Sequence, residues 1–153
     1  MSTMAVDFIR RHRLTVADYY RMAEAGILRA DARVELIEGE IIDVAPIGSE
    51  HAAAVNLLNR ILQRAVSDFA IVQVQNPISL GEHSEPEPDI ALLRPRTDFY
   101  KTAHPKASDI LLVIEVADTS LRYDRDVKVP LFARYGIPEV WIIDLKNREL
   151  LRF

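Results

Sequence analysis

The fold is decided by a stretch that begins with Glu85-Pro-Glu-Pro-Asp89 and continues as the apolar run Ile90-Ala-Leu-Leu93. A second apolar run, Ile110-Leu-Leu-Val-Ile114, follows about twenty residues later. Short continuous apolar runs are typical of central strands whose two faces are both covered. One acid, Asp89, precedes the first run, and another, Glu115, follows the second. The sequence therefore predicts two buried strands that hold two carboxylates at their ends.

Outward from these strands, the chain alternates between helical and strand patterns. Thr15 and Asp18 form a capping-box pair that predicts a helix start, and Gly26 is a suitable stop. Glu38-Gly39 between two apolar runs predicts a hairpin. The remaining patterns predict helices over residues 49–65 and 126–135, and strands over residues 71–74, 77–80, 140–144 and 149–153. The predicted fold class is α/β, a mixed sheet flanked by helices.

Composition narrows the class of protein. The 153 residues favour one domain, 1–153, and the absence of cysteine excludes disulfides and thiolate metal sites. No apolar stretch reaches a membrane span, and the N-terminus does not resemble a signal peptide, so we expect a cytoplasmic protein. The net charge of -4 does not favour nucleic acid as a partner. Acidic catalytic clusters lower such a total, however, while basic patches elsewhere can still contact phosphates.

The two acids and a later lysine point to phosphodiester hydrolysis. That reaction needs a divalent cation, an activated water and charge stabilisation at phosphorus. Asp89 and Glu115 can supply carboxylate ligands of the kind that Mg²⁺ prefers, and Lys128 can orient the water or stabilise the developing charge. The alternatives are a turn role for Asp89, a structural salt bridge for Glu115 and a solvated surface position for Lys128.

Three residues of the first half of the chain are weaker candidates. Glu35 lies on a hairpin strand, where alternation points it either to water or into the same cleft. His51 heads a helix, and such a histidine is more often a packing or capping residue than a ligand. Gln75 ends a strand and can contact substrate or pair with the backbone.

The acidic run after Glu115 has a simpler interpretation. We expect Asp118, Asp124 and Asp126 to be solvated residues that cap a helix, and Glu87 to be a turn residue. Asp124 is the exception to test, because it stands where it can hold Lys128 or the local loop.

Several motifs together resemble a known family. They are Arg33-Val-Glu-Leu-Ile-Glu-Gly-Glu40, Pro46-Ile-Gly-Ser-Glu-His51, Gln75-Asn-Pro77, Glu85-Pro-Glu-Pro-Asp89, Leu112-Val-Ile-Glu-Val-Ala-Asp118, Ser120-Leu-Arg-Tyr-Asp124 and the segment 128–136. The combination resembles the Uma-two family of restriction-endonuclease-like proteins, in the PD-(D/E)xK nuclease superfamily. The resemblance covers residues 14–153.

This resemblance implies a restriction-endonuclease-like mixed β-sheet with an N-terminal β-hairpin extension. It implies Asp89 and Glu115 as metal-binding carboxylates, with the backbone carbonyl of Val116 as a further ligand. The superfamily's lysine position is Ala117 here, and the resemblance implies that Lys128, on the following helix, takes its place. It also implies that Glu35 contributes to catalysis, that His51 lines the site, and that Mg²⁺ is the cofactor, with Mn²⁺ as a substitute.

Three functions follow as hypotheses. The first is a metal-dependent DNA endonuclease that hydrolyses phosphodiester bonds with a metal-activated water and acts as a homodimer. The second is a catalytically silent nucleic-acid-binding module, and the third is a protein-interaction domain on the same fold. The chain ends at Phe153, where we expect further strand, so a C-terminal truncation is part of the prediction.

Overall fold

The structure is a computed structural model that describes residues 9–153. The N-terminus, for which the sequence predicts no signal peptide, lies outside these residues. The chain divides into two compact units, one formed by the residues up to 44 with 81–85, the other by 45–80 with 86–153. The single domain over 1–153 stays a prediction. No helix among residues 9–153 combines the length and apolar character that a membrane crossing requires.

The first unit begins with helix α1, Val16–Glu24. Its capping box is formed as predicted, because the Thr15 hydroxyl accepts from the Asp18 N–H at 3.1 Å and the Asp18 carboxylate accepts from the Thr15 N–H at 2.9 Å. The helix ends before Gly26, which has a φ of 75°. Both predicted boundaries of α1 are therefore confirmed.

The predicted hairpin is also formed in this unit. Strand β1, Val34–Ile37, pairs antiparallel with β2, Glu40–Asp43. Both turn residues adopt left-handed backbone angles, with φ of 50° at Glu38 and 82° at Gly39. Two such residues in sequence define the tight turn that matches strand twist. The 81–85 segment closes the unit, since the Glu85 N–H donates to Leu36 O at 2.8 Å.

The second unit is built on a five-stranded sheet. The strands are β3 Ile71–Val74, β4 Ile90–Leu93, β5 Ile110–Ala117, β6 Val140–Asp144 and β7 Glu149–Arg152, in the order β3-β4-β5-β6-β7. Only β5 and β6 run parallel, while every other neighbouring pair is antiparallel. The prediction of a mixed α/β sheet is confirmed.

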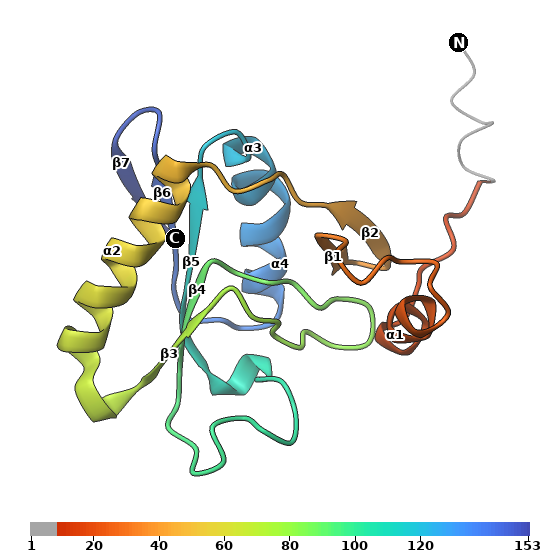
Figure 1. Cartoon of the computed structure of the whole chain (residues 1–153), viewed down its shortest axis with the longest axis horizontal. Coiled ribbons are helices and arrows are strands. Elements are labelled where there is room, and N and C mark those ends of the chain that lie inside the picture. The colour runs from red at the N-terminus through yellow and green to blue at the C-terminus, as the bar shows by residue number, and fades with distance from the viewer. Residues whose placement is uncertain (1–8) are drawn as a thin grey trace. The chain divides into compact units, whose positions relative to one another are not determined.

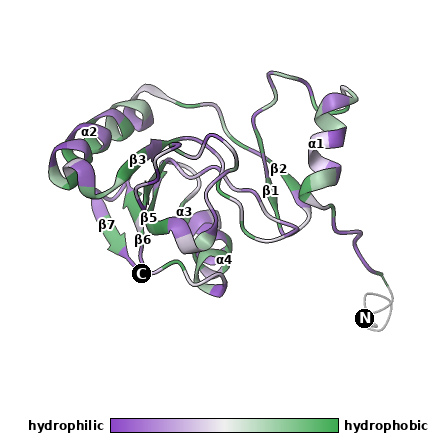
Figure 2. Cartoon of the chain, turned by 90° about the horizontal axis from the view of Figure 1, so that it is seen from below, coloured by the Kyte–Doolittle hydropathy of each residue, from purple (hydrophilic) through white to green (hydrophobic). Residues whose placement is uncertain are grey.

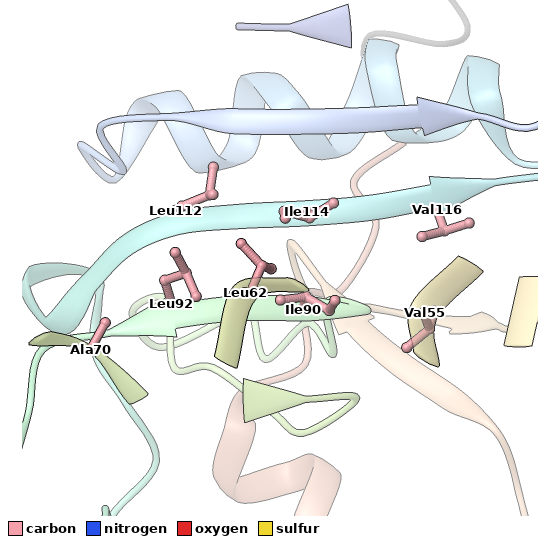
Figure 3. Close-up of a cluster of buried hydrophobic side chains, with 8 residues drawn as sticks. All are labelled: Val55, Leu62, Ala70, Ile90, Leu92, Leu112, Ile114 and Val116. Atoms are coloured by element: carbon pink, nitrogen blue, oxygen red, sulfur yellow. The ribbon is translucent and has the colours of Figure 1, made fainter. Parts of the chain in front are cut away.

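Helices cover both faces of this sheet. Helix α2, Ser49–Val66, lies on one face and α4, Val129–Arg134, on the other (Figure 1). Hydrophilic and hydrophobic residues alternate along α2, as Figure 2 shows, so one side of the helix can pack. Val55 and Leu62 of α2 belong to the same buried cluster as Ile90 of β4 and Ile114 of β5 (Figure 3). Ile61 of the same helix is 52% exposed and does not belong to this contact.

The single tryptophan, Trp141, also packs against this core from β6. Its indole Nε1–H donates to Glu139 Oε1 at 2.9 Å. Two short 3₁₀ turns, Ser67–Phe69 and Ala107–Asp109, complete the connections beside the sheet.

The structure corrects one predicted strand. Residues 77–80 form no strand, and only Ser79 makes an isolated bridge, to Lys106. Pro77 has no N–H to donate to a ladder, which limits pairing here. Ile78 and Leu80 are nevertheless fully buried, so the apolar signal was a signal of burial and not of strand pairing.

The helix that carries Lys128 also begins earlier than predicted. It starts with α3, Leu121–Tyr123, continues through the π-helical segment η4, Asp124–Lys128, and ends as α4. The Val129 N–H reaches back five residues to Asp124 O. Pro130 follows directly and lacks the N–H for a normal helical turn, and the wider π turn makes room for its ring. The predicted stop at Gly136 is confirmed by its φ of 76°.

Candidate active site at the edge of strands β4 and β5

The register of β4 and β5 brings the two predicted carboxylates together. Ile90 pairs with Ile114 in the antiparallel ladder, so the next position places Asp89 opposite Glu115. Directly opposed residues of antiparallel strands point to the same face, with Cβ atoms about 5 Å apart. Because Ile90 and Ile114 face α2, Glu115 faces the other side of the sheet, where η4 and α4 lie. Asp89 just precedes β4 and is also within reach of His51 near the start of α2.

Asp89 is held by contacts on both carboxylate oxygens. Its Oδ2 accepts from the Val116 N–H at 2.7 Å, and its Oδ1 lies 3.2 Å from His51 Nε2. The Gln75 amide Nε2 lies 3.5 Å from the same Oδ1, and the Gln75 N–H donates to Asp89 O at 3.1 Å. The structure thus brings His51, Gln75 and Val116 to Asp89, and Asp89 is more than a simple turn residue.

These contacts determine the protonation state of Asp89. Burial would raise the pKa of this carboxyl, but the hydrogen bonds from His51 and Val116 and the charges of His51 and Lys128 outweigh it. The pKa of Asp89 therefore lies below its ordinary value. An ionised carboxylate is the form that a cation requires.

Lys128 does not point into bulk solvent. Its Nζ lies 2.7 Å from Glu115 Oε1, and the two side chains are only 4% and 5% exposed. A buried charge pair of this kind is weak evidence for stability, since desolvation offsets much of its attraction. The ammonium of this pair is also close enough to Asp89 for its charge to lower the pKa of that carboxyl.

The donor set suits a hard divalent cation. The peptide groups of Val113 and Ala117 bond to the β6 side of β5, whereas the Val116 N–H points to Asp89. A strand residue directs its N–H and C=O to the same side, so the Val116 carbonyl also faces the Asp89 side. Two carboxylates and one carbonyl are oxygen ligands of the type that Mg²⁺ and Mn²⁺ accept. Among residues 9–153, no three His, Asp or Glu side chains group as metal ligands, so the carbonyl and water would complete the shell.

Two features of the site differ from or go beyond the sequence predictions. Asp124 is 5% exposed and therefore not solvated like Asp118 and Asp126, and its Oδ2 accepts from the Ser120 hydroxyl at 2.6 Å, a contact within the local loop. Their spacing of four residues on a helix was the available signal. Gln75 has a left-handed φ of 50°, which the residues around it do not predict. Non-glycine residues with such angles persist where surrounding structure holds them, often at functional sites.

The other candidates differ in burial. Glu35 lies on β1 of the first unit and is 5% exposed, and its catalytic role stays a prediction. Asp118 and Asp126 are exposed, as expected for solvated residues, and Glu87 is exposed as well.

Comparison with known proteins identifies the family. The sequence model described as "Uma2: Putative restriction endonuclease" matches residues 16–153. The fold is similar to a crystal structure titled as "a putative nuclease belonging to DUF820" from Anabaena variabilis, with a TM-score of 0.69 and 16% sequence identity. That alignment covers 92% of this chain and 79% of the other. A comparison with curated proteins found no match.

The sequence match and the fold agree with the motifs that lead from Asp89 to Lys128. The fold is that of a restriction-endonuclease-like nuclease, with a mixed sheet and helices on both of its faces. The family match spans nearly all of the described residues, and the chain belongs to the Uma2 family of restriction-endonuclease-like proteins.

Proposed function

We propose that this chain is a Mg²⁺-dependent endonuclease that hydrolyses phosphodiester bonds in DNA. One observation carries the proposal: the β4–β5 register sets Asp89 opposite Glu115, and Lys128 Nζ lies 2.7 Å from Glu115 Oε1. Two acids at opposed strand positions, with one ammonium beside them, would provide both a cation site and a positive charge for the transition state.

Asp89, Glu115 and the Val116 carbonyl would hold the cation, with Mn²⁺ as a substitute for Mg²⁺. When bound, the cation supplies a Lewis acid that polarises the phosphoryl group and lowers the pKa of water. Lys128 stabilises negative charge on the phosphate oxygens while the P–O bond to the leaving group breaks. His51 and Gln75 orient the Asp89 carboxylate. DNA as the substrate, a homodimer as the working form and a cytoplasmic location are parts of the proposal that rest on the sequence.

The alternative is a catalytically silent nucleic-acid-binding or protein-interaction module. The buried Glu115–Lys128 pair favours this silent module, because the two groups already neutralise each other. Such a protein would keep the pair as structure and turn over no substrate.

Cleavage of supercoiled plasmid and branched DNA, with Mg²⁺, Mn²⁺ or EDTA, separates these functions. We expect nicking by the wild type with either metal, and loss of at least a hundredfold in Asp89→Asn and Glu115→Gln, as expected when a cation ligand is removed. Asp126→Asn is the matched control, because its carboxylate is exposed and paired with Arg125.

Calorimetry with Mn²⁺ gives an independent readout. We expect binding by the wild type and by Asp126→Asn, and none by Asp89→Asn. Cutting that is equal in all variants would come from a contaminating nuclease. DNA binding without cleavage under either metal would instead establish the silent module.

A further inference from the structure

A loop far from the candidate active site combines positive charge with an exposed aromatic ring. Residues 94–106 connect β4 to the 3₁₀ turn before β5 and are called the basic arm below. The arm contains four Lys or Arg residues and one Asp, a net charge of +3 in a chain whose total is -4. Arg94, Lys101 and Lys106 are exposed. The acidic total of the chain therefore conceals a local site of opposite sign.

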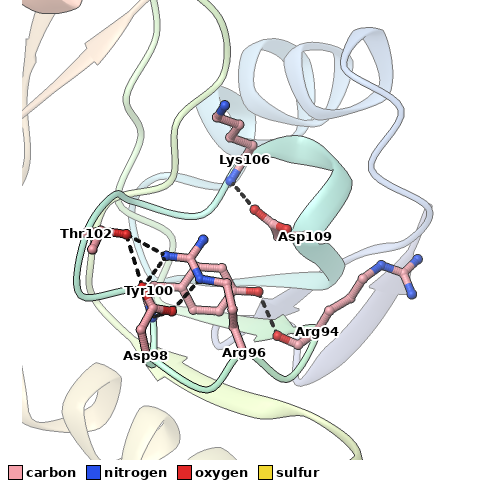
Figure 4. A network of polar contacts seen from close by, with 7 residues as sticks. All are labelled: Arg94, Arg96, Asp98, Tyr100, Thr102, Lys106 and Asp109. Carbon is pink, nitrogen blue, oxygen red and sulfur yellow. Dashed lines mark hydrogen bonds and ion pairs between the residues drawn. The ribbon is translucent and has the colours of Figure 1, made fainter.

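The arm is held rigid by its own side chains (Figure 4). Arg96 binds Asp98 through two nitrogens, at 2.5 and 3.0 Å, and its guanidinium stacks 4.1 Å from the centre of the Tyr100 ring. The Tyr100 hydroxyl donates to Arg94 O at 2.6 Å, and the Thr102 hydroxyl donates to Asp98 at 3.0 Å. These contacts fix the loop without help from a ligand.

Phe99 is the residue that this scaffold presents to solvent. Its side chain is 75% exposed, and its backbone has a left-handed φ of 50°. A bulky residue in that region is unfavourable by roughly 1–3 kcal/mol, and an exposed ring gains nothing from burial. Asp98 supports the strained turn by accepting from the Tyr100 N–H at 3.3 Å. The arm thus holds an aromatic ring in water at a cost to stability.

A groove lies beside this ring. It has a volume of about 780 Å³ and is bounded by Phe99 and Arg96 of the arm, Ile71 and Val72 of β3, and Gln63 near the end of α2. One acid, Asp68, lies in the lining on the side of α2. A cavity of this size with apolar walls and a few polar groups can take a flat organic ring.

We propose that the basic arm is a docking site for a single-stranded segment of nucleic acid, with one base stacked on Phe99 and phosphates beside Arg94 and Lys101. Charge complementarity selects this occupant over an apolar protein surface. Arg96 is paired with Asp98, but the exposed cations Arg94 and Lys101 stand before and after the ring in the sequence, and the arm as a whole carries +3. A positively charged track with aromatic platforms is how proteins bind single strands without reading their sequence. The inference rests on the proposed function, since it supplies a second contact for the same class of substrate.

The arm and the candidate active site lie at opposite ends of β4. Arg94 comes five positions after Asp89, which is about 17 Å along an extended strand. A nucleic-acid strand that contacts both must bridge this distance, which corresponds to about five nucleotides at the 3.4 Å spacing of stacked bases. The arm therefore matters for long substrates and not for very short ones.

Binding of a fluorescein-labelled 20-mer of thymidine, measured by anisotropy in EDTA, tests the arm without catalysis. Phe99→Asn removes the ring but suits a left-handed φ, so the fold is retained. We expect about tenfold weaker binding by Phe99→Asn, since stacking on one aromatic ring is worth about 1–3 kcal/mol. Phe99→Tyr should bind within about twofold of the wild type, because it keeps a stacking face.

The charge contribution has its own matched pair. Lys101→Ala should lower the salt dependence of binding by about one unit of log-log slope, as the loss of one phosphate contact does. Arg60→Ala removes an exposed cation from α2 and should leave the slope unchanged. For cleavage, Phe99→Asn should raise KM on the 20-mer with an unchanged kcat, and should have no effect on a trinucleotide.

Several outcomes would contradict the proposal that the basic arm binds a single strand. They are equal affinity of Phe99→Asn and wild type, no binding of the oligomer by the wild type, or a homodimer that dissociates in Phe99→Asn, which would make the groove a contact between copies. Failure of the proposed function is separate, because it would appear as an absence of cleavage while the effect of Phe99→Asn on binding remains.

Discussion

At the scale of single residues, the most consequential contact is the ion pair between Glu115 and Lys128. Both side chains are buried, and each charge is neutralised by the other. Such a pair is worth little when compared with apolar residues of the same size, but the loss of one partner leaves an uncompensated charge. The pair is therefore sensitive to single changes and tolerant of double ones.

We expect Lys128→Met to lower the free energy of unfolding by about 3 kcal/mol, and the double variant Glu115→Leu with Lys128→Met to recover to within about 1 kcal/mol of wild type. Urea unfolding followed by circular dichroism measures both. Arg125→Met is the control, because it breaks an exposed pair with Asp126 and should cost less than about 1 kcal/mol. A small loss in Lys128→Met would contradict the burial of the pair.

At the scale of elements, the hairpin turn is the point where backbone geometry and packing act together. Gly39 has a φ of 82°, and a Cβ added there would lie 2.7 Å from the Cα of Arg13. Gly26 has a similar φ of 75° but nothing within 4 Å of the added Cβ. The two glycines therefore separate the cost of a left-handed backbone from the cost of a close approach.

We expect Gly26→Ala to destabilise the protein by about 1 kcal/mol, from backbone angle alone. Gly39→Ala should cost more than about 3 kcal/mol, since the segment around Arg13 must also move. Hydrogen exchange of the β1 and β2 amides measures the effect where it arises. Equal protection in the two variants would mean that the N-terminal segment does not pack on the turn.

The elements also show what sequence patterns can and cannot predict. Capping at Thr15, the turn at Glu38 and Gly39, and the two central strands depend on local chemistry, and all were predicted correctly. The strand over 77–80 was wrong because a buried apolar run looks the same whether or not its backbone pairs. The π turn before Val129 depends on how the helix accommodates Pro130 against the sheet. Neighbouring residues in the sequence do not determine that packing, so the π turn could not be predicted.

The same distinction applies to the candidate site. Asp89 and Glu115 could be located because strand ends are visible in sequence. Lys128 was a candidate as well, but choosing it over a solvated surface position depended on the family resemblance. The hydrogen bonds of Asp89 to His51 and Val116 join residues 38 and 27 positions apart, and only the folded sheet brings them together.

At the scale of the whole molecule, several carboxyls have pKa values below their ordinary range. Hydrogen bonds from Thr15 and Arg21 lower the pKa of Asp18 to about 2, and hydrogen bonds from Arg96 lower that of Asp98. The Asn147 side chain and N–H lower the pKa of Asp144. One of these carboxyls lies in the first unit and two lie in the second. Protonation at low pH therefore destabilises both units.

A carboxyl whose pKa is lowered by folding stabilises the protein fully when the pH is above the pKa that the group has in the unfolded chain, near 4. This contribution is lost as the pH falls through the pKa that the group has in the folded protein. We expect the free energy of unfolding to be nearly constant from pH 7 to pH 5 and to fall steadily between about pH 4 and pH 2. Urea titrations at each pH measure this. Asp98→Asn should flatten the fall, and an identical slope in that variant would show that Arg96 does not hold the carboxylate.

The position of Trp141 has a practical consequence for all of these measurements. It is the only tryptophan of the chain, and it packs in the core of the unit that carries Asp89, Glu115 and Lys128. The first unit, which holds the hairpin and is called the hairpin unit here, contains Tyr19 and Tyr20 but no tryptophan. The second unit is called the sheet unit. Fluorescence excited at the indole band therefore reports on the sheet unit alone, whereas circular dichroism reports on both. Comparing the two signals during unfolding will reveal whether the hairpin unit melts with the sheet or independently of it.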